Sequence, residues 1–404
     1  MTDTTPTAVV RTRIPAALDE VRARLTGNLG SLPVIVGLVI IWVVFQALNP
    51  SFLSPDNLVD LTMQCVAVGT IAIGVVLTLL LGQIDLSVGS VSGLAAAILA
   101  VGLTKFHWPL PLAIGAALLA GVLIGLLYGV LFTRFGVPSF VITLAGLLAV
   151  LGLQLRVLGP SGSINLPFDS PLVLFAHSWF LPPYLAYALA VLWTGGMFTA
   201  AVLRRRRRER AGLPTASLAW DAVKAGALLV LCVFGVAYLA TARGVGAMFV
   251  FFIVLVIVMD IVLTRTRWGR EVYAVGGSVE AARRAGIRVN RVYISVFVLC
   301  SSFAVIGGVL AAGRLTSATL SSGGGDVYLN AIAAAVIGGT SLYGGRGSAW
   351  SALLGVVVIQ SISSGLTLLS LDSSIRYMIT GAVLLLAVII DSIARKSRAA
   401  HGQA

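Results

Sequence analysis

Long runs of apolar residues recur along the whole chain and are separated by short polar stretches. About 20 consecutive apolar residues cross a bilayer as a helix, whereas a β-barrel shows segments of about 10 residues with alternating polarity. The pattern therefore predicts an all-α polytopic membrane protein with about 10–12 transmembrane helices. The predicted crossings are residues 32–48, 58–82, 91–104, 112–132, 139–158, 184–203, 218–241, 245–263, 292–313, 328–342, 349–369 and 374–390.

Two of these crossings, 91–104 and 328–342, are short enough to be broken or re-entrant helices. The transmembrane domain occupies residues 31–391, between an N-terminal tail (1–30) and a C-terminal tail (392–404). In the N-terminal tail, apolar residues recur at Ile14, Leu18, Val21 and Leu25. An interfacial helix on the inner leaflet and a disordered tail both fit this spacing.

Composition agrees with the membrane assignment, because the 404 residues are 58% hydrophobic and only 11% charged. Soluble domains carry roughly 25% charged residues. The net charge of +13 comes mainly from basic clusters beside the apolar runs, at 11–24, 204–210, 264–291 and 395–398. Such clusters mark cytoplasmic loops and place both termini in the cytoplasm. They argue against nucleic-acid binding.

The sequence lacks the residue patterns that an enzyme or an ion-coupled carrier needs. Its three lysines, Lys105, Lys224 and Lys396, lie outside any P-loop, so no ATPase site is expected on this chain. The scattered cysteines and histidines predict no metal site. The acids near the predicted spans fall at or close to span ends, which disfavours a coupling ion bound at mid-membrane: Asp60, Asp85, Asp260, Asp372 and Asp391. We therefore expect an external power source.

One basic segment, residues 264–291 (TRTRWGREVYAVGGSVEAARRAGIRVNR), holds seven arginines and two acids between two apolar runs. Gly276-Gly277 predicts a turn, and Ser278 is a favourable N-cap for a short helix over 279–285. Charges in its first and last turns suit the helix dipole, and Gly286 suits its end. This helix either docks into a soluble partner or is an ordinary solvated loop helix. The candidate docking residues are Ser278, Val279, Glu280, Ala281, Ala282, Arg283, Arg284, Ala285 and Gly286.

Three further groups of residues are candidates for function. Asp85 and Ser87 either cap the following helix or line the exit of a translocation path. A polar stripe at Gln360, Ser363, Ser364 and Thr367 either faces that path or forms hydrogen bonds between helices. Gly344, Gly345, Arg346 and Gly347 form an inner turn whose glycines permit positive φ, and Arg346 suits either an acidic partner or a lipid head group.

Small residues on two of the predicted spans indicate close helix packing. Gly121, Gly125 and Gly129 form a doubled G-x-x-x-G ridge on the fourth span. Ala67, Thr70, Gly74 and Thr78 share one face of the second.

Three motifs occur along the chain in the order GQIDLSVGS (82–90), TRWGREVYAVGGSVEAARRAGIRV (266–289) and AAAVIGGTSLYGGRGS (333–348). Together they resemble the bacterial ABC-importer permeases of the ribose, xylose, arabinose and galactose type. The resemblance covers about residues 55–391, and the IDLSVGS motif favours a sugar over a branched-chain amino acid. Ser278 stands where that family usually has Asn. The segment 184–241 looks like an insertion found in the longer xylose-type permeases, which favours a pentose such as xylose.

The resemblance implies a non-enzymatic permease subunit in the bacterial inner membrane. Its implied partners are a separate ATPase with tandem nucleotide-binding halves that binds ATP and Mg, a periplasmic or lipid-anchored sugar-binding protein, and a second permease copy. Residues 278–286 would be the coupling helix held by the ATPase. An ion-coupled secondary transporter, or a permease for another small solute such as a branched-chain amino acid, is the alternative.

Overall fold

The computed structural model describes residues 32–213 and 218–372, together with single residues between 374 and 389. The described part is almost entirely helical, which confirms the all-α prediction. Its helices are α2 (Leu32–Leu48), α3 (Pro55–Leu80), α4 (Val88–Thr104), α5 (Leu110–Phe135), α6 (Ser139–Leu158), α7 (Pro171–His177), α8 (Pro183–Arg210), α9 (Leu218–Ala240), α10 (Ala247–Arg265), α11 (Arg267–Gly277), α12 (Val279–Arg284), α13 (Val289–Leu315), α14 (Gly325–Ile337) and α15 (Ala349–Leu368). The predicted N-terminal helix, the C-terminal tail and most of the crossing at 374–390 lie outside the described residues.

Eight helices of the described part are long and apolar enough to cross a membrane, and three shorter apolar helices accompany them. The shorter ones are α2, α4 and α14. The two spans that were expected to be short correspond to α4 (17 residues) and α14 (13 residues). At 1.5 Å per residue, α14 is about 20 Å long and does not cross a hydrocarbon core of about 30 Å.

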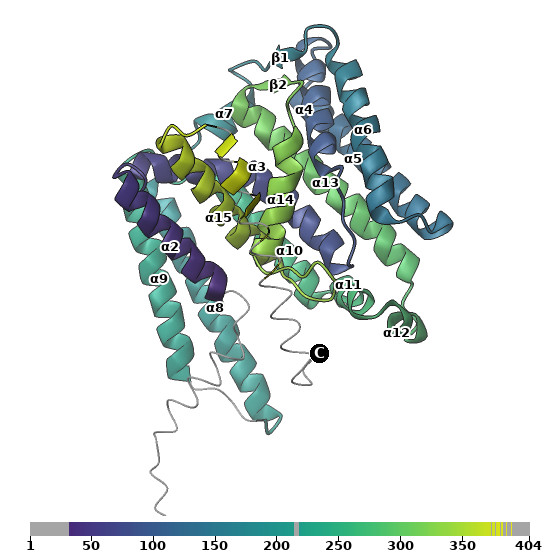
Figure 1. Cartoon of the computed structure of the whole chain (residues 1–404). Helices are drawn as coiled ribbons and strands as arrows, with labels where there is room; N and C mark the ends of the chain where they lie inside the picture. Colours follow the sequence, from purple (N-terminus) through teal and green to yellow (C-terminus); the bar gives the residue numbers. More distant parts are fainter. Residues whose placement is uncertain are drawn as a thin grey trace, which may run out of the picture.

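The centre of the molecule is built from α3 and α13, with α4 and α5 packed on them (Figure 1). The predicted G-x-x-x-G ridge of α5 lies against α13 of the same chain. A Cβ built at Gly125 would be 2.6 Å from the carbonyl oxygen of Phe297. Likewise, a Cβ at Gly74 of α3 would be 2.8 Å from the carbonyl oxygen of Cys300. Both small-residue faces therefore serve close helix packing within one subunit, as expected.

The segments between α6 and α8 and between α13 and α14 contain short elements of secondary structure. Residues of β1 (Ser163–Asn165) pair antiparallel with β2 (Ser317–Thr319), and α7 follows β1 in the same outer segment. Strands of three residues give almost no periodicity, so the sequence pattern did not reveal them. This pairing ties the outer ends of α6 and α13 together.

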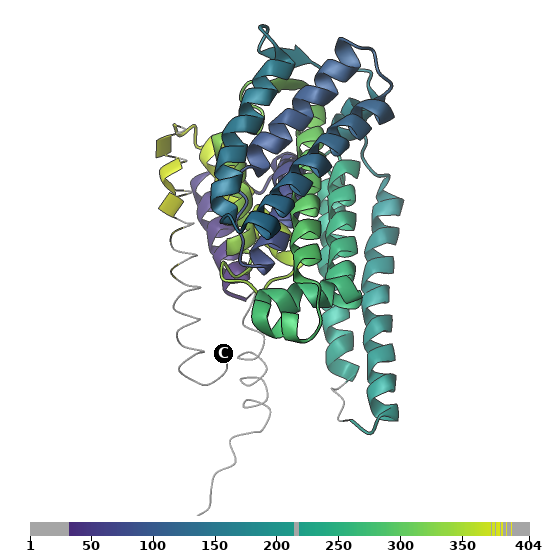
Figure 2. The same ribbon diagram turned by 90° about the vertical axis from the view of Figure 1, so that its right-hand side faces the viewer.

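The pair α8–α9 stands at one side of the bundle in both views (Figures 1 and 2). Most of its surface is exposed: 11% of the apolar window of α8 is buried, and none of that of α9. The span predicted to stop at residue 203 continues as helix through the arginine cluster to Arg210. The arginine end of α8 and the short helices α11 and α12 lie at the same end of the molecule, which agrees with the cytoplasmic placement of both basic clusters (Figure 1).

Candidate coupling site

The short helix α12 has the capping predicted from its sequence. The Ser278 hydroxyl accepts a hydrogen bond from the backbone N–H of Ala281 at 3.3 Å, and Gly286 has a φ of +80° just beyond the last turn. The helix is shorter than predicted, six residues from Val279 to Arg284. Its surface also differs from the expectation, because Ala282 is buried. The candidate docking residues left exposed are Ser278, Val279, Glu280, Ala281, Arg283, Arg284, Ala285 and Gly286.

A second helix, α11, precedes α12 and was missed in the sequence analysis. Thr266 caps its start by accepting a hydrogen bond from Gly269 N at 3.1 Å. Val272 and Val275 are buried. The indole N–H of Trp268 donates to Ser295 Oγ of α13 at 2.8 Å. The segment is therefore an amphipathic helix fixed to the membrane domain, and the chain runs directly from it into α12 at Ser278.

Gly276 and Gly277 were expected to form a turn, and this was wrong, because both belong to α11. The two glycines have different surroundings. A Cβ at Gly276 would lie 1.9 Å from the carbonyl oxygen of Leu80, at the inner end of α3, whereas a Cβ at Gly277 would meet nothing within 4 Å. Gly276 is thus required by a close backbone contact between α11 and α3.

The inner glycine turn completes the same contact. Gly344 and Gly345 have φ values of +88° and +72°, as predicted for this turn. The backbone N–H of Gly345 donates to Leu80 O at 2.8 Å, and the Tyr273 hydroxyl of α11 donates to Gly347 O at 2.8 Å. Arg346 is exposed. Leu80, Tyr273, Gly276, Gly345 and Gly347 are called the coupling junction below.

The coupling junction joins three parts of the chain that are far apart in sequence: the inner end of α3, α11 and the turn before α15. Burial, together with the negative charge of Asp260, raises the pKa of Tyr273, so its hydroxyl keeps the proton that it donates. These backbone contacts leave little room for α11 to move independently of α3 and the glycine turn.

The charges of this segment are mostly exposed. Both of its acids are held by arginines on their own helices: Arg267 with Glu271 at 2.9 Å, and Arg284 with Glu280 at 3.3 Å. Exposed pairs of this kind contribute about 0–1 kcal/mol each. They orient the side chains without fixing the position of the helices, and the excess of arginines leaves the surface positively charged.

Asp85 was expected near the inner end of a span, and the structure corrects this. Its side chain is 0% exposed, in the segment that leads from α3 back into the bundle at the start of α4. Asp85 Oδ1 accepts hydrogen bonds from Ser87 N at 2.8 Å and Ser87 Oγ at 2.7 Å. Its Oδ2 has no partner among the described residues. The pair thus orders the turn before α4, although no side chain caps the helix at Ser87, and a buried carboxylate does lie inside the helical bundle.

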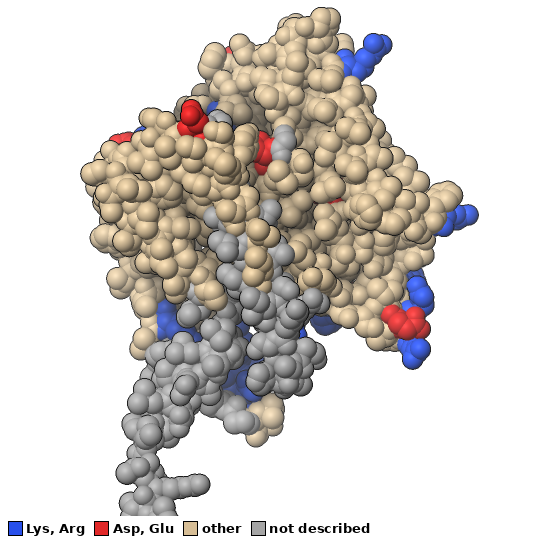
Figure 3. Space-filling model, in the orientation of Figure 1, with Lys and Arg blue, Asp and Glu red and all other residues tan. Residues whose placement is uncertain are grey.

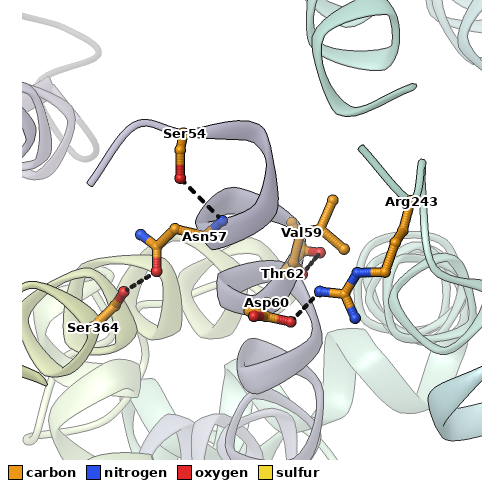
Figure 4. Close-up of polar contacts among 7 residues, drawn as sticks. All are labelled: Ser54, Asn57, Val59, Asp60, Thr62, Arg243 and Ser364. Atoms are coloured by element: carbon orange, nitrogen blue, oxygen red, sulfur yellow. Dashed lines mark hydrogen bonds and ion pairs between the residues drawn. The ribbon is translucent and has the colours of Figure 1, made fainter. Parts of the chain in front are cut away.

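Part of the predicted polar stripe of α15 forms a hydrogen bond to a neighbouring helix (Figure 4). Ser364 Oγ donates to Asn57 Oδ1 of α3 at 2.9 Å, and the neighbouring Ser361 accepts from the indole of Trp42 on α2 at 2.9 Å. Gln360 is 9% exposed. Ser363 and Thr367 lie further toward the outer end, where the Thr367 hydroxyl donates to Ser363 O. Figure 4 also shows Asp60 of α3 paired with Arg243, which precedes α10.

The chain matches the model of the family described as Branched-chain amino acid transport system / permease component over residues 57–388. The chain belongs to this family of transport permeases. The match covers every residue of the coupling junction and also the helices α4 and α14. Membership, together with the long apolar helices, makes the chain a multi-pass protein of the bacterial inner membrane.

Several individual permeases are similar to the chain over most of their length. The Xylose transport system permease protein XylH of Escherichia coli (strain K12) is 34% identical over 372 residues, covering 91% of this chain and 93% of the relative. XylH of Haemophilus influenzae is 32% identical over 375 residues, covering 91% and 98%. The Ribose import permease protein RbsC of E. coli (strain K12) is 29% identical over 358 residues, covering 89% and 92%. No solved structure matches the chain significantly.

Proposed function

We propose that this permease is the membrane-spanning subunit of an ATP-driven importer of a monosaccharide, with a pentose such as xylose as the leading substrate. The observation that carries the proposal is the coupling junction. It connects α12, a short capped helix exposed at the cytoplasmic end, to the packed centre through hydrogen bonds and one backbone contact. The printed names of the relatives, xylose and ribose permeases, support the substrate class.

The proposal includes three partners. A separate ATPase, which binds ATP and Mg, receives residues 278–286 in a groove. A binding protein outside the membrane delivers the sugar, and a second copy of the chain completes the translocation path. The positive surface around α12 fits an acidic rim on the ATPase.

Reconstitution tests the proposal. Sealed vesicles that hold this chain alone should neither accumulate sugar nor hydrolyse ATP. Addition of the ATPase and the binding protein should produce both activities. Sugar uptake by the chain alone under a proton or sodium gradient would contradict the proposal and favour an ion-coupled carrier, for which the buried Asp85 would be the first residue to examine.

A second candidate substrate is a branched-chain amino acid, because the family description names it. The same vesicles separate the two: competition of labelled xylose uptake by unlabelled ribose but not by leucine supports a sugar permease. Competition by leucine alone would reverse the assignment.

A further inference from the structure

A carboxylate lies exposed on the first turn of α14. The carboxylate belongs to Asp326, at the start of this helix. Its side chain is exposed and forms no hydrogen bond or ion pair with any described residue. Figure 3 shows acidic side chains on this face of the molecule within a mostly uncharged surface.

The depth of Asp326 follows from the short helix that carries it. The inner end of α14 leads into the glycine turn, which is bonded to the inner end of α3. Asp326 precedes that end by nearly the full length of α14, about 17 Å by helical rise, which is roughly half of the bilayer thickness. The start of α4 lies at the same level, since a Cβ at Gly89 would be 2.6 Å from Gly323 O and 3.4 Å from Tyr328 Cβ.

The segment before α14 is fixed by hydrogen bonds to α6. Buried Gln154 of α6 donates from Nε2 to Thr319 O at 3.2 Å and to Ser322 O at 2.9 Å. On the other side of this segment, Ser321 and Leu320 are exposed, as is Leu329 one turn further along α14. A fixed, exposed surface of mixed polarity therefore surrounds Asp326.

Three surroundings are available to such a surface: lipid, a tightly packed second subunit, or water. An unpaired carboxylate facing lipid tails is strongly disfavoured. A tightly packed second copy would bury this unpaired carboxylate away from water, which carries a large desolvation cost. A water-filled space fits a carboxylate and a serine hydroxyl, and both accept hydrogen bonds from a neutral polyhydroxylated solute.

We propose that the first turn of α14 lines the water-filled route of the transported sugar, with Asp326 accepting hydrogen bonds from sugar hydroxyls. This inference rests on the proposed importer function. The inference places the sugar route along the exposed face of α14. The polar stripe of α15, the earlier candidate for this route, is partly occupied by a hydrogen bond to α3.

Thiol accessibility tests the route without measuring transport. Asp326→Cys is made in a background in which Cys232 is replaced, since Cys65 and Cys300 are buried. The matched control is Val230→Cys on α9, where the side chain is 69% exposed on the periphery of the bundle. In vesicles holding the assembled transporter, a charged, membrane-impermeant thiosulfonate should modify position 326 but not position 230. After the vesicles are dissolved in denaturing detergent, a neutral maleimide should modify both, which shows that both thiols are present.

Resistance of position 326 to the charged reagent would overturn the inference, whether lipid or a second subunit covers it.

Transport gives the second test. Asp326→Leu should lower sugar uptake at least about tenfold, the effect of losing one hydrogen bond to a charged group, while Asp326→Asn retains most of it. Wild-type uptake by Asp326→Leu would also overturn it. If the wild-type permease takes up no sugar with its ATPase and binding protein, the proposed importer function is wrong. The thiol accessibility of position 326 would still show whether the first turn of α14 faces water.

Discussion

Two arginine-rich stretches of this permease look alike in sequence but differ in how they are attached. The stretch at 264–291 folds into α11 and α12. Two hydrogen bonds fix it to α13 and the glycine turn, and a close backbone contact fixes it to α3. The stretch at 204–210 ends α8 in a pair of helices that is mostly exposed. Charge alone fixes the side of the membrane in both cases. Under the proposed function, attachment to the packed centre lets the first stretch transmit movement, whereas the second stretch only anchors α8.

The largest expected effect concerns the backbone contact of the coupling junction. Gly276→Val places a branched side chain against Leu80 O, where even a Cβ would lie at 1.9 Å, so α11 must move away from α3. We expect sugar uptake to fall below detection while ATP hydrolysis by the assembled complex loses its response to the loaded binding protein. The matched control is Gly277→Val, whose Cβ meets nothing within 4 Å, and it should keep most activity. Equal loss in both variants would show that the contact is not the cause.

A smaller effect is expected for one hydroxyl group. Tyr273→Phe removes the hydrogen bond to Gly347 O and should lower the sugar carried per ATP about three- to tenfold, a loss of about 1 kcal/mol. Tyr238 of α9 also donates to a backbone carbonyl, Leu53 O at 2.9 Å, so Tyr238→Phe is its counterpart in the exposed pair. The second variant should leave that ratio unchanged. A larger effect of Tyr238→Phe would remove the distinction between the two regions.

The capping of α12 should have a still smaller effect. Ser278→Ala removes the acceptor for Ala281 N and should weaken co-purification of the ATPase about fivefold, as expected for a cap worth about 1 kcal/mol. Ser278→Asn supplies another capping side chain and should behave as wild type. Normal association of the alanine variant, measured by titrating detergent-solubilised permease with ATPase, would mean that α12 need not be preformed.

The smallest effect is expected at the arginine end of α8. Arg206→Gln should change neither ATPase association nor sugar uptake by more than about twofold, since an exposed charge contributes little by itself. Arg283→Gln on α12 provides the comparison and should weaken association measurably at low salt. The two variants are compared in the same titration at two ionic strengths. A greater loss for Arg206→Gln would assign docking to α8.

The sequence was sufficient for features that depend on local chemistry. Apolar runs predicted the spans, the Ser278 cap formed as expected, and the G-x-x-x-G ridge of α5 packs closely on another helix. Features that depend on distant segments were missed or wrong. Gly276-Gly277 looked like a turn because its partner, Leu80, lies almost two hundred positions earlier in the chain.

Asp85 shows the same limit. Its position after a long apolar run suggested the membrane surface, but the chain folds back and buries it at the start of α4. Helix α11 had a detectable signal in the Thr266 cap and the apolar residues Trp268, Val272 and Val275, which recur at helical spacing. The density of arginines in the segment obscured that periodicity.

The proposed docking of α12 on the ATPase is tested most directly by a cross-linking comparison between the two arginine-rich stretches. Ala281 of α12 and Ala211 at the end of α8 are both exposed alanines at the cytoplasmic end. Each alanine is changed to cysteine in a separate variant, and each variant permease is assembled with the ATPase. A short thiol-to-amine cross-linker is then added. We expect a permease–ATPase product from Ala281→Cys and none from Ala211→Cys. A product from Ala211→Cys alone would contradict the assignment of α12 as the place where energy enters the permease.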